Sequence, residues 1–330
     1  MKWKVAFAGL RHGHIITLYN RIKADPRFEI AAVCEEDDAA AVNAAEKWQI
    51  PVTCRNFAAM LKDVPFDILA VGDYYGIRGQ RAIAALKAGK HILCDKPLCT
   101  SPDELALIRS LTEEKNLKTG IMLDLRTSPG ITAAKELIDS GALGKIHALS
   151  FGGQHPLNYG KRPGWYFEKG RHGGTINDIA IHGLDAVQYL TGQRITGLTA
   201  AKCRNAFADQ EPDFKDSAQL MFSTADGCSC MADVSYASPD KFGFTLPFYW
   251  RFTLWGKNGV AEFSALRGNV TFYDNVSGEV REISASGEGK EDYLETFTGE
   301  LEGGKPPFGT AYLLDVTATA LKLQQLADKE

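Results

Sequence analysis

Short apolar runs alternate with helix-like segments along the first third of the chain. These runs occupy residues 5–9, 29–34, 66–72, 91–94 and 119–123. Short buried strands separated by helical segments are typical of a parallel sheet with crossover helices. The pattern therefore predicts an N-terminal α/β domain built on a parallel sheet.

Two helices of this region carry clear signals. Ile15, Leu18 and Ile22 place apolar side chains on one face of a helix that Asp25-Pro26 would end. Residues 101–104 supply a serine N-cap, a proline at the first helical position and a glutamate three residues after the cap. The sequence therefore predicts strand, turn, helix and strand at its start, and a further helix over about 102–115.

The pattern changes near residue 124. Segments that alternate apolar and polar residues follow at 217–224, 230–237, 248–256 and 269–274. They predict a mostly antiparallel sheet, and apolar residues at helical spacing predict a closing helix over about 311–328 that packs back on the first domain. We therefore expect an α/β protein with a parallel domain over 1–123 and an α+β domain over 124–330.

Composition narrows the class of protein. The 330 residues include 45% hydrophobic and 24% charged residues and carry a net charge of −4, without the basic block of a nucleic-acid binder. No apolar run approaches the roughly 20 residues that span a bilayer. The seven cysteines are an odd number and are scattered, which favours reduced thiols; packing also accounts for Cys228 and Cys230 better than metal binding does. We expect a cytoplasmic protein.

The turn after the first strand reads Gly9-Leu10-Arg11-His12-Gly13-His14 and only partly fits G-x-G-x-x-G. A dinucleotide site needs glycines there so that the backbone can approach a pyrophosphate at the helix N-terminus. A plain structural turn is equally consistent with these residues alone. Glu35 ends the second strand at the place where a carboxylate would hold a ribose diol. The acids that follow it, 36–38, are read as a solvated helix start, and the acidic run favours NAD over NADP.

Two motifs give the chain a family resemblance. Asp95-Lys96-Pro97 follows a buried strand and resembles the E-K-P motif of the glucose-fructose oxidoreductase, inositol dehydrogenase and MocA family. The segment 172–185 resembles that family's G-G-x-x-x-D-x-x-x-H signature through Gly173, Gly174, Asp178 and His182. The resemblance covers nearly the whole chain. It implies a Rossmann domain that binds NAD or NADP, an α+β domain with an open sheet, a homodimer or homotetramer formed through that sheet, and sugars or cyclitols as substrates.

The chemistry of the motif residues agrees with a dehydrogenase acting on CH–OH groups. Asp178 and His182 are four residues apart, so on a helix they share a face. His182 is the natural base for an alcohol proton because imidazole ordinarily titrates near neutral pH, and Asp178 would orient it or bind a neighbouring hydroxyl. The Lys96 ammonium would stabilise the developing alkoxide, and Pro97 would aim that lysine.

The chain departs from the family pattern at several positions. Asp95 replaces a glutamate, Ala180 replaces a frequent glycine, and Arg11 takes the place of the second glycine. In the segment 73–78, Asp73, Tyr74, Tyr75 and Arg78 take the places of a T-P-N-x-x-H pattern that contacts ribose and nicotinamide. The residues expected to bind the cofactor are Gly9, Arg11, His12, Gly13, Glu35, Asp73, Tyr74, Asp95, Lys96 and Pro97.

The segment 155–172 is rich in aromatic and cationic residues and lies between the two motifs. An aromatic ring there could stack on a sugar, and a solvated loop with one buried tryptophan explains it equally well. The residues expected to bind substrate are Lys96, Arg126, His155, Trp165, Tyr166, Asp178 and His182. No metal is expected, because His12, His14 and His182 lack accompanying carboxylates or thiolates.

Three functions remain open on the sequence alone. The first is an NAD-dependent sugar or cyclitol dehydrogenase that uses Lys96, Asp178 and His182. The second is an enzyme that retains NAD and cleaves glycosides by transient oxidation and elimination. The third is a non-catalytic sugar sensor or scaffold on the same fold, which the altered residues Arg11 and 73–78 would suit.

Overall fold

The computed structural model describes residues 2–289 and 291–329, which fall into two compact units. The first unit contains the residues up to Met122 together with Pro163–Gly173 and Tyr293–Thr317. The second contains Leu123–Arg162, Gly174–Asp292 and the chain from Ala318 onward. The two later segments extend the first unit beyond the range 1–123 that the sequence pattern predicts.

The first unit is built on a five-stranded parallel sheet with the order β2-β1-β3-β4-β5. Its strands are β1 (Trp3–Ala8), β2 (Phe28–Cys34), β3 (Ile68–Val71), β4 (His91–Asp95) and β5 (Thr119–Met122). Each strand coincides with one of the five apolar runs. The predicted parallel α/β architecture is therefore confirmed.

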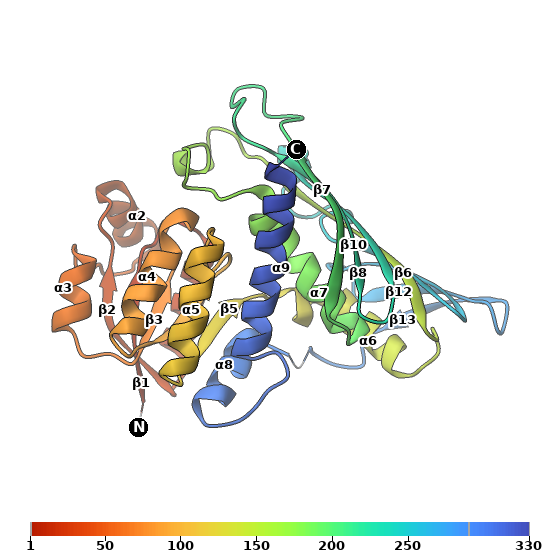
Figure 1. The fold of residues 1–330 in the computed structure, drawn as a ribbon, viewed down its shortest axis with the longest axis horizontal. Coiled ribbons are helices and arrows are strands. Elements are labelled where there is room, and N and C mark those ends of the chain that lie inside the picture. Colours follow the sequence, from red (N-terminus) through yellow and green to blue (C-terminus); the bar gives the residue numbers. More distant parts are fainter. Residues whose placement is uncertain (1, 290, 330) are drawn as a thin grey trace. The chain divides into compact units, whose positions relative to one another are not determined.

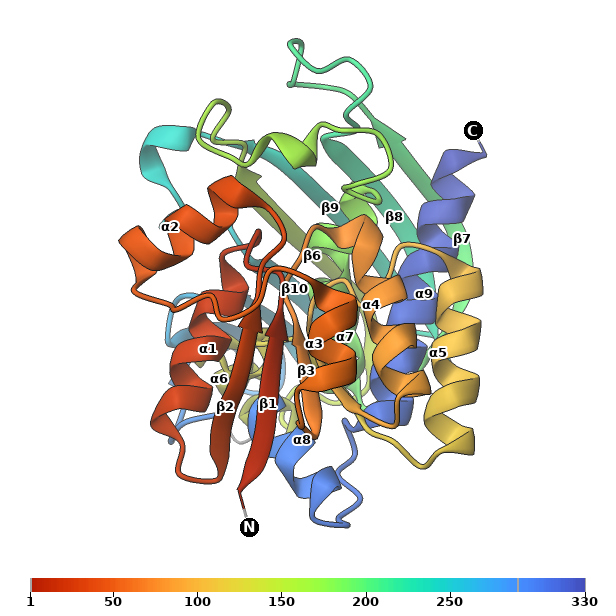
Figure 2. The same ribbon diagram turned by 90° about the vertical axis from the view of Figure 1, so that its left-hand side faces the viewer.

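Helices cover both faces of this sheet. They are α1 (His14–Ala24), α2 (Asp38–Trp48), α3 (Phe57–Asp63), α4 (Tyr75–Lys87), α5 (Pro102–Glu114) and α8 (Tyr293–Leu301). Figure 2 shows α1 on one side of the strands and α3, α4 and α5 on the other. The apolar residues of α1 and α8 share one buried cluster with β1, because the predicted face with Ile15, Leu18 and Ile22 points into the sheet. Helix α1 ends at Ala24 with Asp25 as its C-cap, and Ser101 caps α5, as predicted.

The second unit is built on an eight-stranded sheet with the order β13-β12-β11-β10-β6-β9-β8-β7. Its strands are β6 (Ile146–Pro156), β7 (Ile195–Arg204), β8 (Ser217–Thr224), β9 (Ser229–Ser238), β10 (Arg251–Gly256), β11 (Gly259–Ser264), β12 (Asn269–Asp274) and β13 (Glu279–Ser284). Neighbouring strands are antiparallel except for β6 and β9, which run parallel. The mostly antiparallel sheet is confirmed. The strand predicted over 248–256 is shorter than expected and begins at Arg251.

Helices α6 (Pro129–Asp139) and α7 (Ile181–Thr191) cover one face of this sheet, which leaves the other face open (Figure 1). The packing is close, since a Cβ on Gly183 of α7 would lie 2.2 Å from the ring of Phe151 on β6. The closing helix α9 (Thr310–Asp328) matches its prediction and contributes residues to both units. In the part of the chain described, no helix has the length and apolar character needed to cross a bilayer.

Candidate active site

The turn between β1 and α1 has the backbone geometry of a dinucleotide site. Gly9 has a φ of +79°, and a Cβ there would lie 2.5 Å from the Cβ of Asp73. Only glycine satisfies both conditions. Gly13 precedes α1 with open space around its Cα, and no described side chain caps this helix N-terminus. Uncapped N–H groups at a helix start bind phosphate readily, so the turn fits a pyrophosphate.

Glu35 lies at the carboxyl end of β2, where the ribose of a dinucleotide would need a carboxylate. The side chain is 1% exposed and accepts hydrogen bonds from the backbone N–H groups of Leu10 (2.6 Å) and Asp37 (2.8 Å). Burial raises its pKa, although these two bonds oppose the shift. A carboxylate has about four acceptor positions, so Glu35 retains capacity for a ribose hydroxyl.

Arg11 lies between two carboxylates. Its Nε is 3.3 Å from an Asp73 oxygen and 3.4 Å from a Glu35 oxygen, and its guanidinium is 5.2 Å from the centre of the Tyr74 ring. The arginine at the second glycine position is thus tied to Glu35 and Asp73, both of which are expected cofactor residues. A guanidinium held there carries fixed positive charge toward the phosphate turn.

The acids after Glu35 have structural partners. Asp37 caps α2 by accepting a hydrogen bond from the backbone N–H of Ala40. Glu36 accepts from the backbone N–H of Phe57 and pairs with Arg81. The interpretation of this run as a helix start is confirmed.

Asp95, Lys96 and Pro97 form the end of β4 and the turn that follows it. Asp95 is fully buried, and its Oδ2 lies 2.8 Å from Nη2 of Arg78. Burial alone would raise the pKa of Asp95, but the adjacent guanidinium outweighs burial and holds that pKa well below its usual range. Lys96 is 4% exposed, and its ammonium nitrogen lies 5.8 Å from the centre of the Tyr75 ring.

A directed chain of hydrogen bonds runs from Asp95 through His12. The Nδ1 atom of His12 lies 2.5 Å from Oδ2 of Asp95, and its Nε2 lies 3.1 Å from the hydroxyl of Tyr75. Burial lowers the pKa of His12 to about 3, so the ring is neutral and its single proton sits on the nitrogen that faces the carboxylate. Tyr75 therefore donates to Nε2, and Tyr166, whose hydroxyl is 2.8 Å away, donates to Tyr75.

Trp165 and Tyr166 belong to the first unit and are buried in it. Their rings stack with centres 4.2 Å apart, and the indole N–H donates to the carbonyl of Arg11 at 3.4 Å. They are only 5% and 3% exposed. These two rings therefore pack against the phosphate turn, while residues 159–161, 163–164 and 168–170 of the same segment are exposed. Stacking on a sugar stays a prediction.

His12, His14 and Asp95 bring three possible metal-ligand atoms within 4.8 Å of one another. The sequence argument combined the two histidines with His182 and missed this carboxylate. However, the Asp95 carboxylate already faces the fixed charge of Arg78 and accepts from His12. We assign this cluster to the hydrogen-bonded network and propose no ion in it.

The second unit holds the other motif from Gly174 onward, whereas Gly173 belongs to the first unit. Gly174 has a φ of +100°, and a Cβ there would lie 2.2 Å from the amide oxygen of Gln324, which explains the glycine. The predicted regular helix is interrupted, since Ile176–Ala180 forms a π-helical turn before α7 begins. Such turns insert an extra residue, are frequent at functional sites and leave no trace in apolar spacing.

Asp178 lies in the π-helical turn and His182 in the first turn of α7. The side chain of Asp178 is buried and accepts a hydrogen bond from the hydroxyl of Tyr236 on β9. The His182 ring is 6% exposed, and its Nδ1 lies 3.8 Å from an oxygen of Asp124. Sequence reasoning missed Tyr236 and Asp124, because only the fold brings them to the motif residues.

The remaining expected substrate residues of this unit differ from each other. The Nε of Arg126 lies 2.9 Å from a carboxylate oxygen of Asp185, and both side chains are fully buried. Arg126 therefore forms a buried ion pair with Asp185, and its binding of substrate stays a prediction. The His155 ring is surrounded by aromatic rings, with that of Tyr249 4.9 Å away and that of Trp250 5.7 Å away.

Sequence models of two protein domains match this chain. Residues 3–122 match the oxidoreductase family with an NAD-binding Rossmann fold, and residues 131–262 match the GFO/IDH/MocA C-terminal domain. The chain belongs to the GFO/IDH/MocA family of oxidoreductases. The resemblance drawn from the motifs at 95–97 and 173–182 is thereby confirmed.

Several named proteins are similar to this family member. Levoglucosan dehydrogenase of Pseudarthrobacter phenanthrenivorans is 29% identical over 166 residues, covering 49% of this chain and 42% of that protein. Inositol 2-dehydrogenase 2 of Saccharopolyspora erythraea is 27% identical over 219 residues, covering 65% and 60%. The matched regions therefore span about half the length of these relatives.

Solved structures share the whole fold. A putative oxidoreductase from Thermotoga maritima superposes with a TM-score of 0.84 at 23% identity, covering 98% of each chain. A levoglucosan dehydrogenase in complex with NADH and levoglucosan superposes with a TM-score of 0.79 at 20% identity, covering 100% of this chain and 98% of that one. At these identities the likeness is one of fold.

Proposed function

We propose that this protein is an NAD-dependent dehydrogenase that oxidises a secondary alcohol of a sugar, a cyclitol or a derivative, or reduces the corresponding ketone. The observation that carries the proposal is Lys96, held at the end of β4 in a Rossmann domain whose phosphate turn fits a dinucleotide. Relatives named as levoglucosan and inositol dehydrogenases support this substrate class. The comparisons favour this function over glycoside cleavage and over a sensor.

Different cofactor residues would bind different parts of the dinucleotide. Gly9 and Gly13 would admit the pyrophosphate, with Arg11 as its counter-charge, and Glu35 would accept from a ribose hydroxyl. Asp73 and Tyr74 flank Arg11 at the end of β3. The carboxylates of Glu35 and Glu36 would repel a 2′-phosphate, so we propose NAD and not NADP.

The chain's own residues supply the acid–base chemistry. NAD, when bound, would accept or return the hydride. The Lys96 ammonium would donate a hydrogen bond to the reacting oxygen and stabilise its negative charge. His182 would take the alcohol proton, and the nearby Asp124 would stabilise the resulting imidazolium. Asp178, held by Tyr236, would accept from a substrate hydroxyl.

Titration calorimetry with NAD and NADP, followed by a screen of polyols and aldoses for NADH formation, tests this function. We expect NAD to bind at least about tenfold more tightly than NADP, and at least one polyol to yield NADH. If neither NAD nor NADP binds, every enzymatic role proposed here is refuted.

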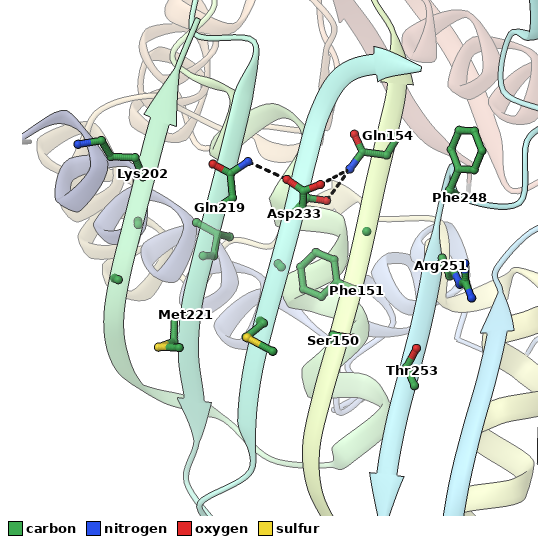
Figure 3. A pocket seen from close by; sticks show the side chains of 16 residues that line it. Ser150, Phe151, Gln154, Lys202, Gln219, Met221, Asp233, Phe248, Arg251 and Thr253 are labelled. Carbon is green, nitrogen blue, oxygen red and sulfur yellow. Dashed lines mark hydrogen bonds between the residues drawn. The ribbon is translucent and has the colours of Figure 1, made fainter. Parts of the chain in front are cut away.

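We also propose a homodimer or homotetramer formed through the open face of the second-unit sheet. A shallow depression of about 820 Å³ lies on this face. Met221 and Met231 are 46% and 55% exposed there, and Figure 3 shows Asp233 bridging Gln219 and Gln154 across neighbouring strands. Because Gln154, Asp233 and Gln219 are hydrogen-bonded to one another and the two thioethers are exposed, the face suits a second copy of itself across a two-fold axis.

Sedimentation of the purified protein tests the assembly. We expect the wild type to sediment as a dimer or tetramer and Met231→Glu to sediment as a smaller species, because a carboxylate would be buried at the interface. Val42→Glu, at an exposed position of α2 in the first unit, is the matched control and should leave the assembly intact. A monomeric wild type would refute the assembly.

We place the protein in the cytoplasm. All seven cysteines are free thiols, and Cys34, Cys94, Cys99, Cys228 and Cys230 are buried. Free thiols in a protein with this many cysteines suit a reducing compartment. Fractionation of cells that express the protein would check the location.

A further inference from the structure

Arg78 makes more polar contacts with the Asp95-Lys96-Pro97 segment than sequence reasoning predicts. It lies on α4, is fully buried, and has its guanidinium at the carboxyl end of β4. Its Nη1 donates to the backbone carbonyls of Asp95 (2.9 Å) and Lys96 (2.5 Å) and reaches that of Pro97 at 3.4 Å. Its Nη2 donates to the Asp95 carboxylate at 2.8 Å.

The same guanidinium ties this segment to the neighbouring strand end. Its Nε donates to the carbonyl of Asp73 at 2.7 Å, just beyond β3. Carbonyls at the end of a strand leave the sheet ladder and need other donors when buried. The rigid fork of an arginine can satisfy several of them at once, whereas the single ammonium of a lysine cannot keep that geometry.

The side chain of Lys96 leaves the backbone between the carbonyls that Arg78 holds. The carbonyls before and after the Lys96 Cα are both bonded to Nη1. In addition, the Tyr75 ring lies 4.6 Å from the Arg78 guanidinium and 5.8 Å from the Lys96 ammonium, so it packs against both. The direction in which the Lys96 side chain leaves the backbone is therefore set by the hydrogen bonds of Arg78 to the neighbouring carbonyls and not by Pro97 alone.

We propose that Arg78 is the positioning residue of Lys96, acting through the backbone carbonyls of 95–97 and the carboxylate of Asp95. This inference rests on the proposed function, because Lys96 is the group that would act on the reacting oxygen. It extends that function by assigning a role to a buried arginine on another element. A purely structural arginine would support folding without directing Lys96.

A labelling experiment tests the position of Lys96 without any turnover. Purified wild type and Arg78→Lys are treated briefly with an amine acetylating reagent, and the acetylation of Lys96 is measured by peptide mass spectrometry against the exposed Lys87. We expect slow labelling of Lys96 in the wild type and about tenfold faster labelling in Arg78→Lys, because the lost hydrogen bonds release the segment. Arg126→Lys alters an equally buried arginine of the second unit and controls for a general loss of packing. Lys96 in this variant should be acetylated at the wild-type rate.

A double-mutant cycle on turnover gives the second readout. We expect Arg78→Lys to lower kcat by about 10- to 100-fold with KM changed less than about threefold, and to cause no further loss in a Lys96→Met background. Equal losses in both backgrounds, or unchanged labelling of Lys96, would overturn the proposal. If Arg78→Lys does not fold, Arg78→Met combined with Asp95→Asn, which removes both buried charges, takes its place. A wild type without dehydrogenase activity would refute the proposed function, and the labelling would still decide the role of Arg78.

Discussion

The Nδ1 atom of His12 lies 2.5 Å from the Oδ2 atom of Asp95, although the two residues are 83 positions apart in the chain. This contact joins the phosphate turn to the end of β4. The histidine is buried and neutral, and the aspartate is ionised beside Arg78. The hydrogen bond that links the phosphate turn to the segment carrying Lys96 thus depends on a neutral His12 that faces an ionised Asp95.

The first prediction concerns the pH dependence of stability. The pKa of His12 is about 3 in the folded protein and near 6.5 when the chain is unfolded. Below pH 6.5 the unfolded chain therefore binds a proton that the folded protein does not, and the stability contributed by neutral His12 is lost as pH falls from about 6.5 toward 3. Compared with His12→Gln, the wild type should lose up to about 1.4 kcal/mol of unfolding free energy per pH unit in this window.

Urea unfolding at a series of pH values measures this difference. The comparison with His12→Gln cancels the contributions of the titratable groups that do not contact His12, because those groups titrate alike in both proteins. Parallel stability curves for the two proteins between pH 4 and 6.5 would show that His12 titrates normally.

The second prediction concerns the buried pair of the second unit. Arg126→Met leaves the Asp185 carboxylate buried without its 2.9 Å partner and should destabilise the protein by about 3–5 kcal/mol. Arg126→Met combined with Asp185→Leu should recover most of that loss, since no buried charge remains. Chemical unfolding of the three proteins provides the measurement; a single variant as stable as wild type contradicts the structural role.

The third prediction separates the two glycines of the phosphate turn. Gly9→Ala forces a side chain into a left-handed backbone and into contact with Asp73, so it should cost about 1–3 kcal/mol. Gly13→Ala meets no atom within 4 Å and should change the unfolding free energy by less than about 0.5 kcal/mol. Thermal unfolding distinguishes the two, and similar losses in both variants would mean that the turn differs from the one described.

The fourth prediction concerns Tyr236. Tyr236→Phe removes the hydroxyl that donates to Asp178 and leaves that buried carboxylate short of one donor. We expect kcat/KM for the preferred polyol to fall about tenfold, with little change in NAD affinity. Tyr273→Phe on β12, whose side chain is exposed, is the matched control. Equal kinetic constants for the wild type, Tyr236→Phe and Tyr273→Phe would show that the Tyr236 hydroxyl does not affect the function of Asp178.

Local sequence signals were sufficient for most of the fold. The apolar runs and the Ser101 cap lie within a few residues of the elements they predict, because strand burial and helix capping are local properties. The π-helical turn at Ile176–Ala180 and the return of Pro163–Gly173 to the first unit leave no such signal. Both depend on tertiary contacts.

The candidate site was predicted in part for the same reason. Motif spacing identified Lys96, Asp178 and His182, since those residues carry the family pattern in the sequence itself. It did not identify Arg78, Tyr236 or Asp124 as their partners, because each partner comes from a distant element. The ion pair of Arg126 with Asp185 also left no signal in the sequence, since an arginine near a motif has the same letter whether it faces a ligand or a buried carboxylate.

The most direct test of the account is NADH formation from a polyol by the wild type, Lys96→Met and His182→Ala. We predict that both variants form NADH at least about a hundredfold more slowly, because an electrostatic contact and a base are lost, and that His182→Ala binds NAD with nearly wild-type affinity. Wild-type rates in both variants would contradict the assignment of Lys96 and His182 and with it the proposed mechanism.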